Sequence, residues 1–128
     1  MRHWLLLFLT LLISKPAWAE VGLATYYTEA SCKREGTSGV WTASGARFDE
    51  NALTCARRSR EWGSRWRVTN LENGKSIIVT QNDFGPGKRP YKRGVRIDLT
   101  KAAWLAIGLQ PLGARHGRGE VKVLVERV

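Results

Sequence analysis

The sequence predicts one small domain of the mainly β class, a barrel of several short strands with one or two short helices. Three observations support this prediction. Short runs of β-branched and aromatic residues recur along the chain, separated by glycine-rich and polar turns. A single segment, just after residue 100, has the spacing of an amphipathic helix. A length of 128 residues suits one domain with a modest core.

The N-terminal segment is typical of a secretory signal peptide. Met1–His3 carries positive charge, Trp4–Ile13 is predominantly apolar, and Ala17–Ala19 has the small-x-small pattern of a cleavage site. The apolar run is too short to span a bilayer as a helix. We therefore expect a signal peptide over residues 1–19, a folded domain over residues 20–128, and a periplasmic or secreted protein without a transmembrane segment.

The chain is strongly basic, with 21 Lys and Arg against 11 Asp and Glu and a net charge of +10. Such charge attracts polyanions but specifies no chemistry. In an intracellular protein, nucleic acid would be considered first. An exported protein meets other polyanions, such as peptidoglycan peptide carboxylates, teichoic acids, lipopolysaccharide or acidic polysaccharides. We expect a wall polymer as partner and no nucleic acid; a purely solubilising charge is the alternative.

Cys32 and Cys55 are the only cysteines. Export places them in an oxidising compartment, which favours a disulfide between them that would stabilise the fold by roughly 3 kcal/mol. Only His116 remains after the predicted signal peptide, which argues against a metal site and a catalytic cysteine. We expect no metal and no cofactor. Cys32 also lies too far beyond the apolar run to carry a lipid anchor.

The first half of the predicted domain alternates between strand and loop. Residues 21–28 are rich in β-branched and aromatic side chains and predict the first strand. Residues 31–39 form a polar loop, and residues 41–45 have the small side chains of a tight turn. Residues 48–55 are mixed and suggest one helical turn. Residues 57–65 predict a cationic loop.

A β-hairpin follows. Residues 66–71 and 76–81 alternate between apolar and polar, and both predict strands. Residues 72–75 contain Asn73-Gly74, a pair that tolerates the positive φ angles of tight hairpin turns.

The stretch after the hairpin places two carboxylates near strand ends. Asp83 follows the second hairpin strand and precedes a glycine-rich turn. Residues 88–93 form a cationic loop, and Asp98 lies on the next short strand. Strands hold acids rigidly while loops shape a binding surface, so this stretch predicts a sugar- or anion-handling site.

The C-terminal part predicts the helix and a closing strand. Thr100 can cap a helix over residues 101–107 that ends at Gly108. Residues 111–119 predict a glycine-rich basic loop. Residues 121–128 alternate between apolar and charged and predict the last strand.

An ordered set of motifs carries a family resemblance. The motifs are Gly22-x-Ala24-Thr25-Tyr26-Tyr27, Thr42-Ala43-Ser44-Gly45, Leu53-Thr54, the hairpin from Trp66 to Ser76, Asn82-Asp83-x-Gly85-Pro86, and Arg96-Ile97-Asp98-Leu99-Thr100. Together they resemble the RlpA-like double-psi β-barrel family (rare lipoprotein A, septal ring lytic transglycosylases) within the wider expansin- and barwin-like superfamily. The resemblance implies a six-stranded double-psi β-barrel.

The resemblance also implies an activity. Members bind a glycan chain on the barrel surface, and some cleave the bond between N-acetylmuramic acid and N-acetylglucosamine without water, leaving a 1,6-anhydro end. This reaction needs one carboxyl group that protonates the leaving oxygen and then accepts a hydroxyl proton. It also needs stabilisation of an oxocarbenium-like charge.

The resemblance assigns candidate site residues. Asp83 matches the catalytic Asp, with an Asx-turn role as the alternative, and Asp98 is the second carboxylate, with helix capping as its alternative. Independently of the resemblance, exposed aromatic side chains could stack on sugar rings, with packing beneath long loops as the alternative. The candidate substrate-binding residues are Tyr27, Trp41, Ser44, Asn82 and Arg96.

Two departures from the family pattern bear on function. Ala46 stands where the family usually has a Glu thought to matter for catalysis, and Cys55 and Arg57 replace the usual Ala and His, which fits the predicted disulfide. Three hypotheses follow: a monomeric exported lytic transglycosylase, a non-catalytic glycan-binding or wall-loosening module, and a secreted protein that binds another protein. The complete motif around Asp83 favours the first, whereas Ala46 favours the second.

Overall fold

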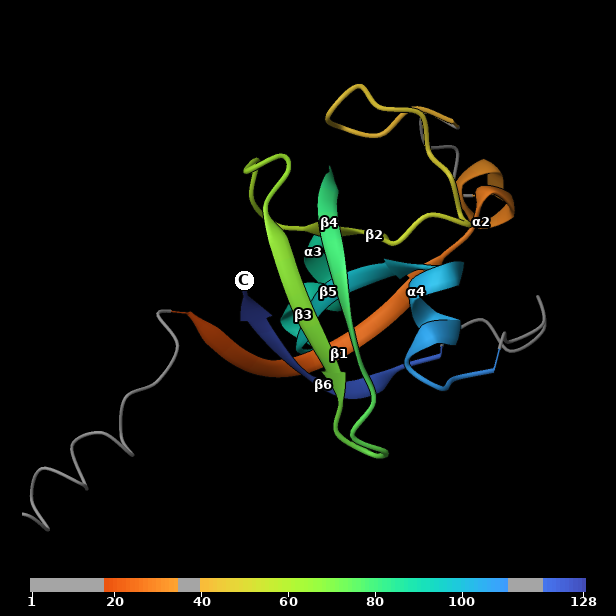
Figure 1. Ribbon diagram of the computed structural model, residues 1–128. Coiled ribbons are helices and arrows are strands. Elements are labelled where there is room, and N and C mark those ends of the chain that lie inside the picture. The colour runs from red at the N-terminus through yellow and green to blue at the C-terminus, as the bar shows by residue number, and fades with distance from the viewer. Residues whose placement is uncertain (1–17, 35–39, 111–118) are drawn as a thin grey trace, which may run out of the picture.

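The structure is a computed structural model that describes residues 18–34, 40–110 and 119–128. Six strands form a closed barrel in the order β1-β5-β2-β4-β3-β6, and three short helices lie outside it (Figure 1). The strands are β1 (Ala19–Tyr27), β2 (Thr54–Arg57), β3 (Arg65–Asn70), β4 (Ser76–Phe84), β5 (Val95–Thr100) and β6 (Val121–Arg127). The helices are α2 (Glu29–Arg34), α3 (Lys88–Lys92) and α4 (Lys101–Ala106). The predicted small, mainly β barrel is confirmed.

Strand pairing mixes both directions. The pairs β1–β5 and β2–β4 are parallel, and the other four pairs around the barrel are antiparallel. The predicted hairpin is the β3–β4 pair, in which Gly74 has a φ of +77° and donates its N–H to the Asn70 carbonyl at 2.7 Å. The hairpin is confirmed, but its turn is not the two-residue turn expected from Asn73-Gly74. The Asn70 N–H donates to the Lys75 carbonyl at 2.8 Å, so four residues form the loop, and Asn73 does not have a positive φ.

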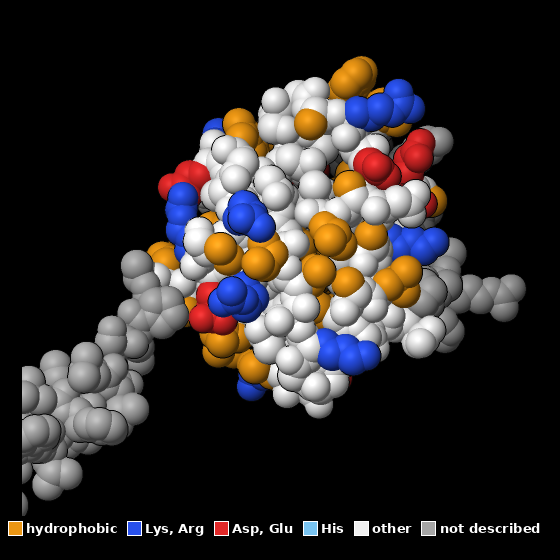
Figure 2. Space-filling view, in the orientation of Figure 1, with side chains coloured by type: hydrophobic (Ala, Val, Ile, Leu, Met, Phe, Trp, Pro, Cys, Tyr) orange, Lys and Arg blue, Asp and Glu red, His pale blue; other side chains and the backbone are white. Residues whose placement is uncertain are grey.

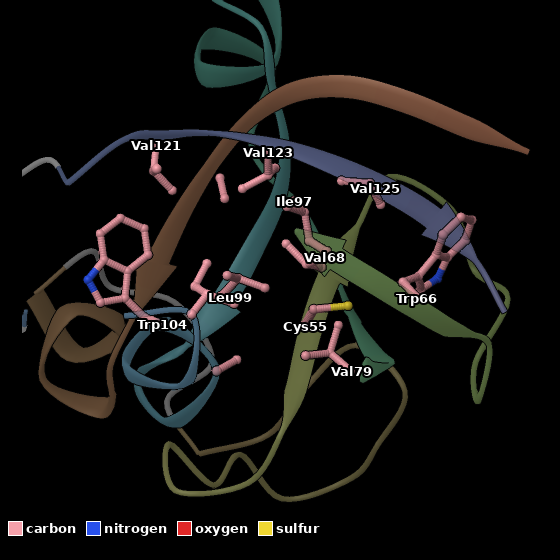
Figure 3. Close-up of a cluster of buried hydrophobic side chains, with 13 residues drawn as sticks. Cys55, Trp66, Val68, Val79, Ile97, Leu99, Trp104, Val121, Val123 and Val125 are labelled. Atoms are coloured by element: carbon pink, nitrogen blue, oxygen red, sulfur yellow. The ribbon is translucent and has the colours of Figure 1, made fainter. Parts of the chain in front are cut away.

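The barrel interior is filled mostly by small β-branched and aliphatic side chains, with an indole at either end of the cluster (Figure 3). Its buried members are Ala24, Cys55, Trp66, Val68, Val79, Ile97, Leu99, Ala103, Trp104, Ile107, Val121, Val123 and Val125. Branched side chains suit the pleated inner surface of a narrow barrel. On the face shown in Figure 2, Lys and Arg side chains are spread over the surface, with acidic side chains in a few small groups.

Helix α4 closes one end of the core as predicted. The Thr100 hydroxyl accepts a hydrogen bond from the Ala103 N–H at 3.3 Å and caps its first turn. The Ile107 carbonyl after its last turn accepts bonds from the Asn70 and Asn73 side-chain amides, both at 3.0 Å. These amides satisfy a helix-end carbonyl that would otherwise lack a partner, and they fix the helix to the hairpin.

Three local predictions were wrong. The predicted loop over residues 31–39 begins inside α2, and its last five residues lie outside the described ranges. The expected helical turn over residues 48–55 ends instead in strand β2, which lies between β4 and β5 and shows no alternation because both its sides are covered. The cationic loop over residues 88–93 contains α3, where Pro90 is tolerated because first-turn N–H groups have no intrahelical acceptor.

The structure describes one of the two cysteines of the predicted disulfide. Cys55 is a free cysteine with a fully buried side chain. β2 directs this side chain into the barrel, where Figure 3 places it near Val68 and Val79. The side chain of Cys32 lies outside the described residues. The disulfide between Cys32 and Cys55 therefore stays a prediction.

The start of the described chain is part of the barrel wall. Ala19 begins β1 and pairs with Glu126 of β6. Trp18 packs edge-on against Trp66, with ring centroids 4.9 Å apart. The signal peptide itself stays a prediction, as residues 1–17 lie outside the described ranges. Nowhere in the described ranges is there a helix of the length and apolarity needed to cross a membrane.

Candidate functional site

An irregularity in the β2–β4 pairing determines where Asp83 points. Cys55 pairs with Gln81 and Ala56 with Asp83, so Asn82 is an extra residue on β4. This is the arrangement of a β-bulge, which reverses the facing of the residues that follow it. Cys55 faces the core, so its neighbour Ala56 faces outward, and Asp83 shares that outer side.

Asp98 reaches the same outer surface from the other side of β2. It pairs with Ala56 across the β2–β5 ladder and with Thr25 across the β1–β5 ladder. The two acids thus lie on the strands on either side of Ala56. Two strand spacings put their Cα atoms roughly 10 Å apart. The Thr25 hydroxyl donates to Asp98 Oδ1 at 2.9 Å. Ala56, which lies between the two carboxylates, is buried.

Three donors hold the Asp83 carboxylate. Oδ1 accepts the backbone N–H groups of Ala43 and Phe84, both at 2.9 Å. Oδ2 accepts the hydroxyl of Tyr27 at 3.2 Å. A carboxylate oxygen has two lone-pair sites, so Oδ1 is saturated by the described residues. Oδ2 keeps one site with no partner in the described ranges, and that oxygen is the one available to carry a proton.

Tyr27 acts as a fixed donor at this site. Its ring stacks on Phe48 with centroids 4.7 Å apart. Burial raises the pKa of the Tyr27 phenol far above its ordinary value, and the charges of Asp83 and Asp98 raise it further. The phenol therefore stays protonated and donates to Asp83 at any pH at which the protein is folded.

A tight turn over residues 42–46 covers the site and supplies the Ala43 donor. The Thr42 N–H and hydroxyl both donate to the Ala46 carbonyl, at 2.9 and 2.8 Å. Gly45 has a φ of +91°, a conformation that strongly favours glycine. The Ser44 N–H donates to the Asn82 carbonyl at 3.3 Å, which ties the turn to the bulge. The predicted tight turn is confirmed, and its function is to position a backbone amide.

The predicted substrate-binding residues are not all in one place. Tyr27 and Ser44 lie at Asp83, where they position the carboxylate and the turn. Asn82 contacts the turn through its backbone, and its side-chain Oδ1 is buried with no hydrogen-bond partner among the described residues. Trp41 begins the segment leading into the turn and is 57% exposed. Arg96 lies apart from Asp83: it stacks on Tyr91 and donates to the Tyr91 carbonyl.

Arg57, which replaces the histidine usual in the family pattern, is largely buried at the barrel end. Its guanidinium lies 4.1 Å from the Trp66 ring centroid and 4.6 Å from that of Trp18. It forms an ion pair with Glu20 at 2.9 Å. These contacts give Arg57 a structural role.

Sequence reasoning missed three contributors to the site. Thr25 and the backbone N–H of Ala43 each donate to one of the carboxylates, and Phe48 supports Tyr27. Thr25 lies two residues before Tyr27 on the first strand, so strict alternation places both side chains on the same face. This pattern could have identified Thr25 from the sequence. The other two are brought to the site by loop geometry that no local pattern predicts. No cluster of three or more metal-ligating side chains occurs in the described part of the chain.

Known proteins were compared with the chain. A family model described as "Lytic transglycolase" matches residues 19–125. A protein of Synechocystis sp. named "Probable endolytic peptidoglycan transglycosylase RlpA" is 42% identical over 92 residues, which cover 72% of this chain and 26% of that protein. A protein of the same name from Nostoc sp. is 40% identical over 100 residues, covering 78% of this chain and 25% of that one. From Yersinia pestis, "Endolytic peptidoglycan transglycosylase RlpA" is 42% identical over 86 residues, covering 67% and 21% respectively.

The chain therefore spans about a quarter of the length of the curated relatives it matches. Among solved structures, the Streptomyces papain inhibitor superposes with a TM-score of 0.58 at 22% identity, covering 88% of this chain and 96% of that one. This similarity concerns the fold alone. The family match extends over β1 to β6 and includes both outward-facing carboxylates, so the chain belongs to the lytic transglycolase family of double-psi β-barrel domains.

Proposed function

We propose that the chain is an exported lytic transglycosylase that acts on the glycan strands of peptidoglycan in the periplasm or outside the cell. The observation that carries the proposal is the geometry of Asp83, whose carboxylate is fixed by three donors while one lone-pair site of Oδ2 faces no described partner. Relatives named as endolytic peptidoglycan transglycosylases support the choice of substrate.

In the proposed reaction, protonated Asp83 delivers its proton from Oδ2 to the glycosidic oxygen between N-acetylmuramic acid and N-acetylglucosamine. The bond from this oxygen to the muramic C1 breaks, and positive charge develops on the muramic ring. The C6 hydroxyl of the same sugar attacks C1 and returns its proton to Asp83, giving a 1,6-anhydro end. One carboxyl group serves as acid and then as base, and no water is consumed.

The proposed role of Asp98 is electrostatic. It lies on the same outer surface, and its charge acts on Tyr27 together with that of Asp83. A second negative charge near the reacting sugar stabilises the oxocarbenium-like transition state more than the neutral ground state. Tyr27 positions Asp83 and leaves Oδ2 in a single orientation.

Mass spectrometry of products released from purified sacculi tests the proposal. Wild-type protein is expected to release anhydro-ended muropeptides, and Asp83→Asn to release none. Glu72→Gln is the matched control, because Glu72 is an exposed carboxylate in the turn that precedes β4, and Asp83 lies at the opposite end of that strand. Release of reducing-end fragments by wild-type protein would show a hydrolase and contradict the proposal.

A second candidate function is a glycan-binding module without catalysis, and Ala46 is the observation that favours it. Ala46 is exposed and ends the turn that supplies a donor to Asp83. Its methyl group cannot take over the proton transfer or charge stabilisation of a glutamate. If the protein is such a binding module, wild-type protein is expected to pellet with sacculi and release no products, and Ala46→Glu is expected to create anhydro products. If wild-type protein is active, Ala46→Glu is expected to raise its rate by only a few-fold.

A further inference from the structure

Gln81 is a fully buried polar residue near the end of β4, and the proposed mechanism does not use it. Its backbone N–H donates to the Ser64 carbonyl and its carbonyl accepts the Gly63 N–H, both at 2.9 Å. Its side-chain Nε2 donates to the Ser59 carbonyl at 2.8 Å, and its Oε1 accepts the Ser64 hydroxyl at 3.2 Å. Backbone and side chain of Gln81 are thus both bonded to residues 57–64, which lead from the end of β2 to β3 and which we call the clamp segment.

The clamp segment also holds the chain beyond Asp83. The Gly85 N–H donates to the Arg57 carbonyl at 3.2 Å. Arg58 Nη1 donates to the Pro86 carbonyl at 3.0 Å. The clamp segment therefore bonds β4 just before Asp83 and the turn just after it.

The clamp segment is itself fixed to the barrel. The Ser64 hydroxyl accepts a hydrogen bond from Nε1 of Trp66, a buried core residue, at 3.0 Å. Glu61 forms an ion pair with Arg127 on β6. Gly63 has a φ of +87°, a conformation that strongly favours glycine. A segment held by core and strand contacts can act as a rigid support for the residues bonded to it.

The buried amide of Gln81 fixes the register of β4 at the point where the bulge begins. A slip of β4 by one residue would bring Thr80 or Asn82 to this position. Their shorter side chains would not reach the Ser59 carbonyl and the Ser64 hydroxyl as Gln81 does. Because buried polar groups without partners are costly, the network opposes such a slip.

The placement of Asp83 depends on this register. Its donors come from two other parts of the chain: the Ala43 N–H at 2.9 Å from the 42–46 turn, and the Tyr27 hydroxyl at 3.2 Å from β1. Hydrogen bonds weaken steeply when their geometry is lost, so the carboxylate must be delivered accurately to meet both.

We propose that Gln81 is a positioning residue for Asp83: together with the clamp segment it holds the end of β4 where the Asp83 carboxylate meets its donors. The effect of Gln81 on rate rests on the proposed function, whereas the placement of Asp83 can be measured without activity. Gln81 is fully buried, so it acts through Asp83 and does not contact a glycan itself.

The amide proton of Ala43 reports the position of Asp83 in NMR spectra, because Ala43 lies in an exposed turn and its N–H donates to Asp83 Oδ1. Asp83→Ala gives the reference resonance for loss of this bond. Gln81→Met keeps a long side chain and removes its polar atoms, and is expected to move the Ala43 resonance towards that reference. Ser64→Ala removes one hydroxyl from the same network, and a smaller shift in the same direction is expected.

Asn70→Leu is the matched control. Asn70 is as fully buried as Gln81, and its side chain donates to the Ile107 carbonyl near the hairpin, at the other end of β4. Asn70→Leu is expected to lower stability and to leave the Ala43 resonance in place. Thermal melts establish which variants fold, and Ser64→Ala decides the question if Gln81→Met does not. An unchanged Ala43 resonance in folded Gln81→Met, or an equal shift in Asn70→Leu, would overturn the inference.

Kinetics on solubilised glycan strands extend the test. Gln81→Met is expected to lower kcat by about tenfold with KM unchanged, because small misplacements of a reacting group slow the chemical step. If wild-type protein releases no anhydro products while Gln81→Met moves the Ala43 resonance, the proposed catalysis falls and the positioning role stands. If products form and the resonance does not move, the positioning role falls and the proposed function stands.

Discussion

Asp83 and Asp98 lie on either side of Ala56 on the same outer surface, but different kinds of donor hold them. Asp83 receives two backbone N–H groups and a phenol that burial keeps protonated. Asp98 receives the hydroxyl of Thr25, a side chain on a neighbouring strand. A carboxylate held by backbone amides cannot rotate without breaking loop geometry, and this is why we propose Asp83 for the proton transfer. The comparison teaches that two acids on one surface can be held by different kinds of donor, backbone amides in one case and a neighbouring side chain in the other.

The largest expected effect comes from Asp83→Asn. If Asp83 is the acid and base, release of anhydro products should fall by about a thousandfold, within the range that general acid–base catalysis contributes. The melting temperature should change little, because asparagine keeps the Oδ1 acceptor for both backbone donors. Initial rates on sacculi and a thermal melt measure both effects. A loss below tenfold would transfer the acid/base role to Asp98.

A smaller effect is expected from Asp98→Asn. If Asp98 acts through its negative charge, replacing it with the neutral amide of asparagine should lower the rate by about tenfold, while the product stays anhydro-ended. The rates of Asp98→Asn and Asp83→Asn are compared on the same sacculi. A loss in Asp98→Asn as complete as that in Asp83→Asn would erase the distinction between the two carboxylates.

Tyr27→Phe separates positioning from substrate contact. Removing the hydroxyl takes one donor from Asp83 but keeps the stacking on Phe48, so kcat on solubilised glycan strands should fall by about fivefold with KM unchanged. A raised KM with unchanged kcat would restore the sequence-based prediction that Tyr27 contacts the glycan. Tyr26→Phe is the control, since Tyr26 packs against Trp104 with ring centroids 4.8 Å apart.

The smallest effect on activity is expected at Cys55, which lies beneath Ala56 on the core side. Cys55→Ala should leave the rate unchanged and lower the free energy of unfolding by about 1 kcal/mol through lost packing. Burial raises the pKa of the Cys55 thiol, so a thiol reagent should react with it slowly in native protein and fully after denaturation. Absence of any thiol in denatured, unreduced protein would establish the predicted disulfide instead.

Local sequence was sufficient where neighbouring residues set the geometry. The position of the β3–β4 hairpin follows from Asn73-Gly74, and the start of α4 follows from the Thr100 cap. Pattern reasoning failed at β2, a four-residue strand covered on both sides, because its burial comes from loops and strands distant in the chain. It also failed at α3, where charged residues and a proline predicted a loop.

The sequence by itself determined the fold class, the ordered motifs and the identity of the two candidate acids. Only the tertiary structure decided how these acids are held. The bulge at Asn82 turns Asp83 outward, the loop amide of Ala43 saturates one of its oxygens, and Tyr27 on β1 bonds the other. The tertiary structure also placed the guanidinium groups of Arg58 and Arg60 against the rings of Phe84 and Tyr91. These contacts join residues far apart in the chain, and barrel closure, which no local pattern encodes, brings them together.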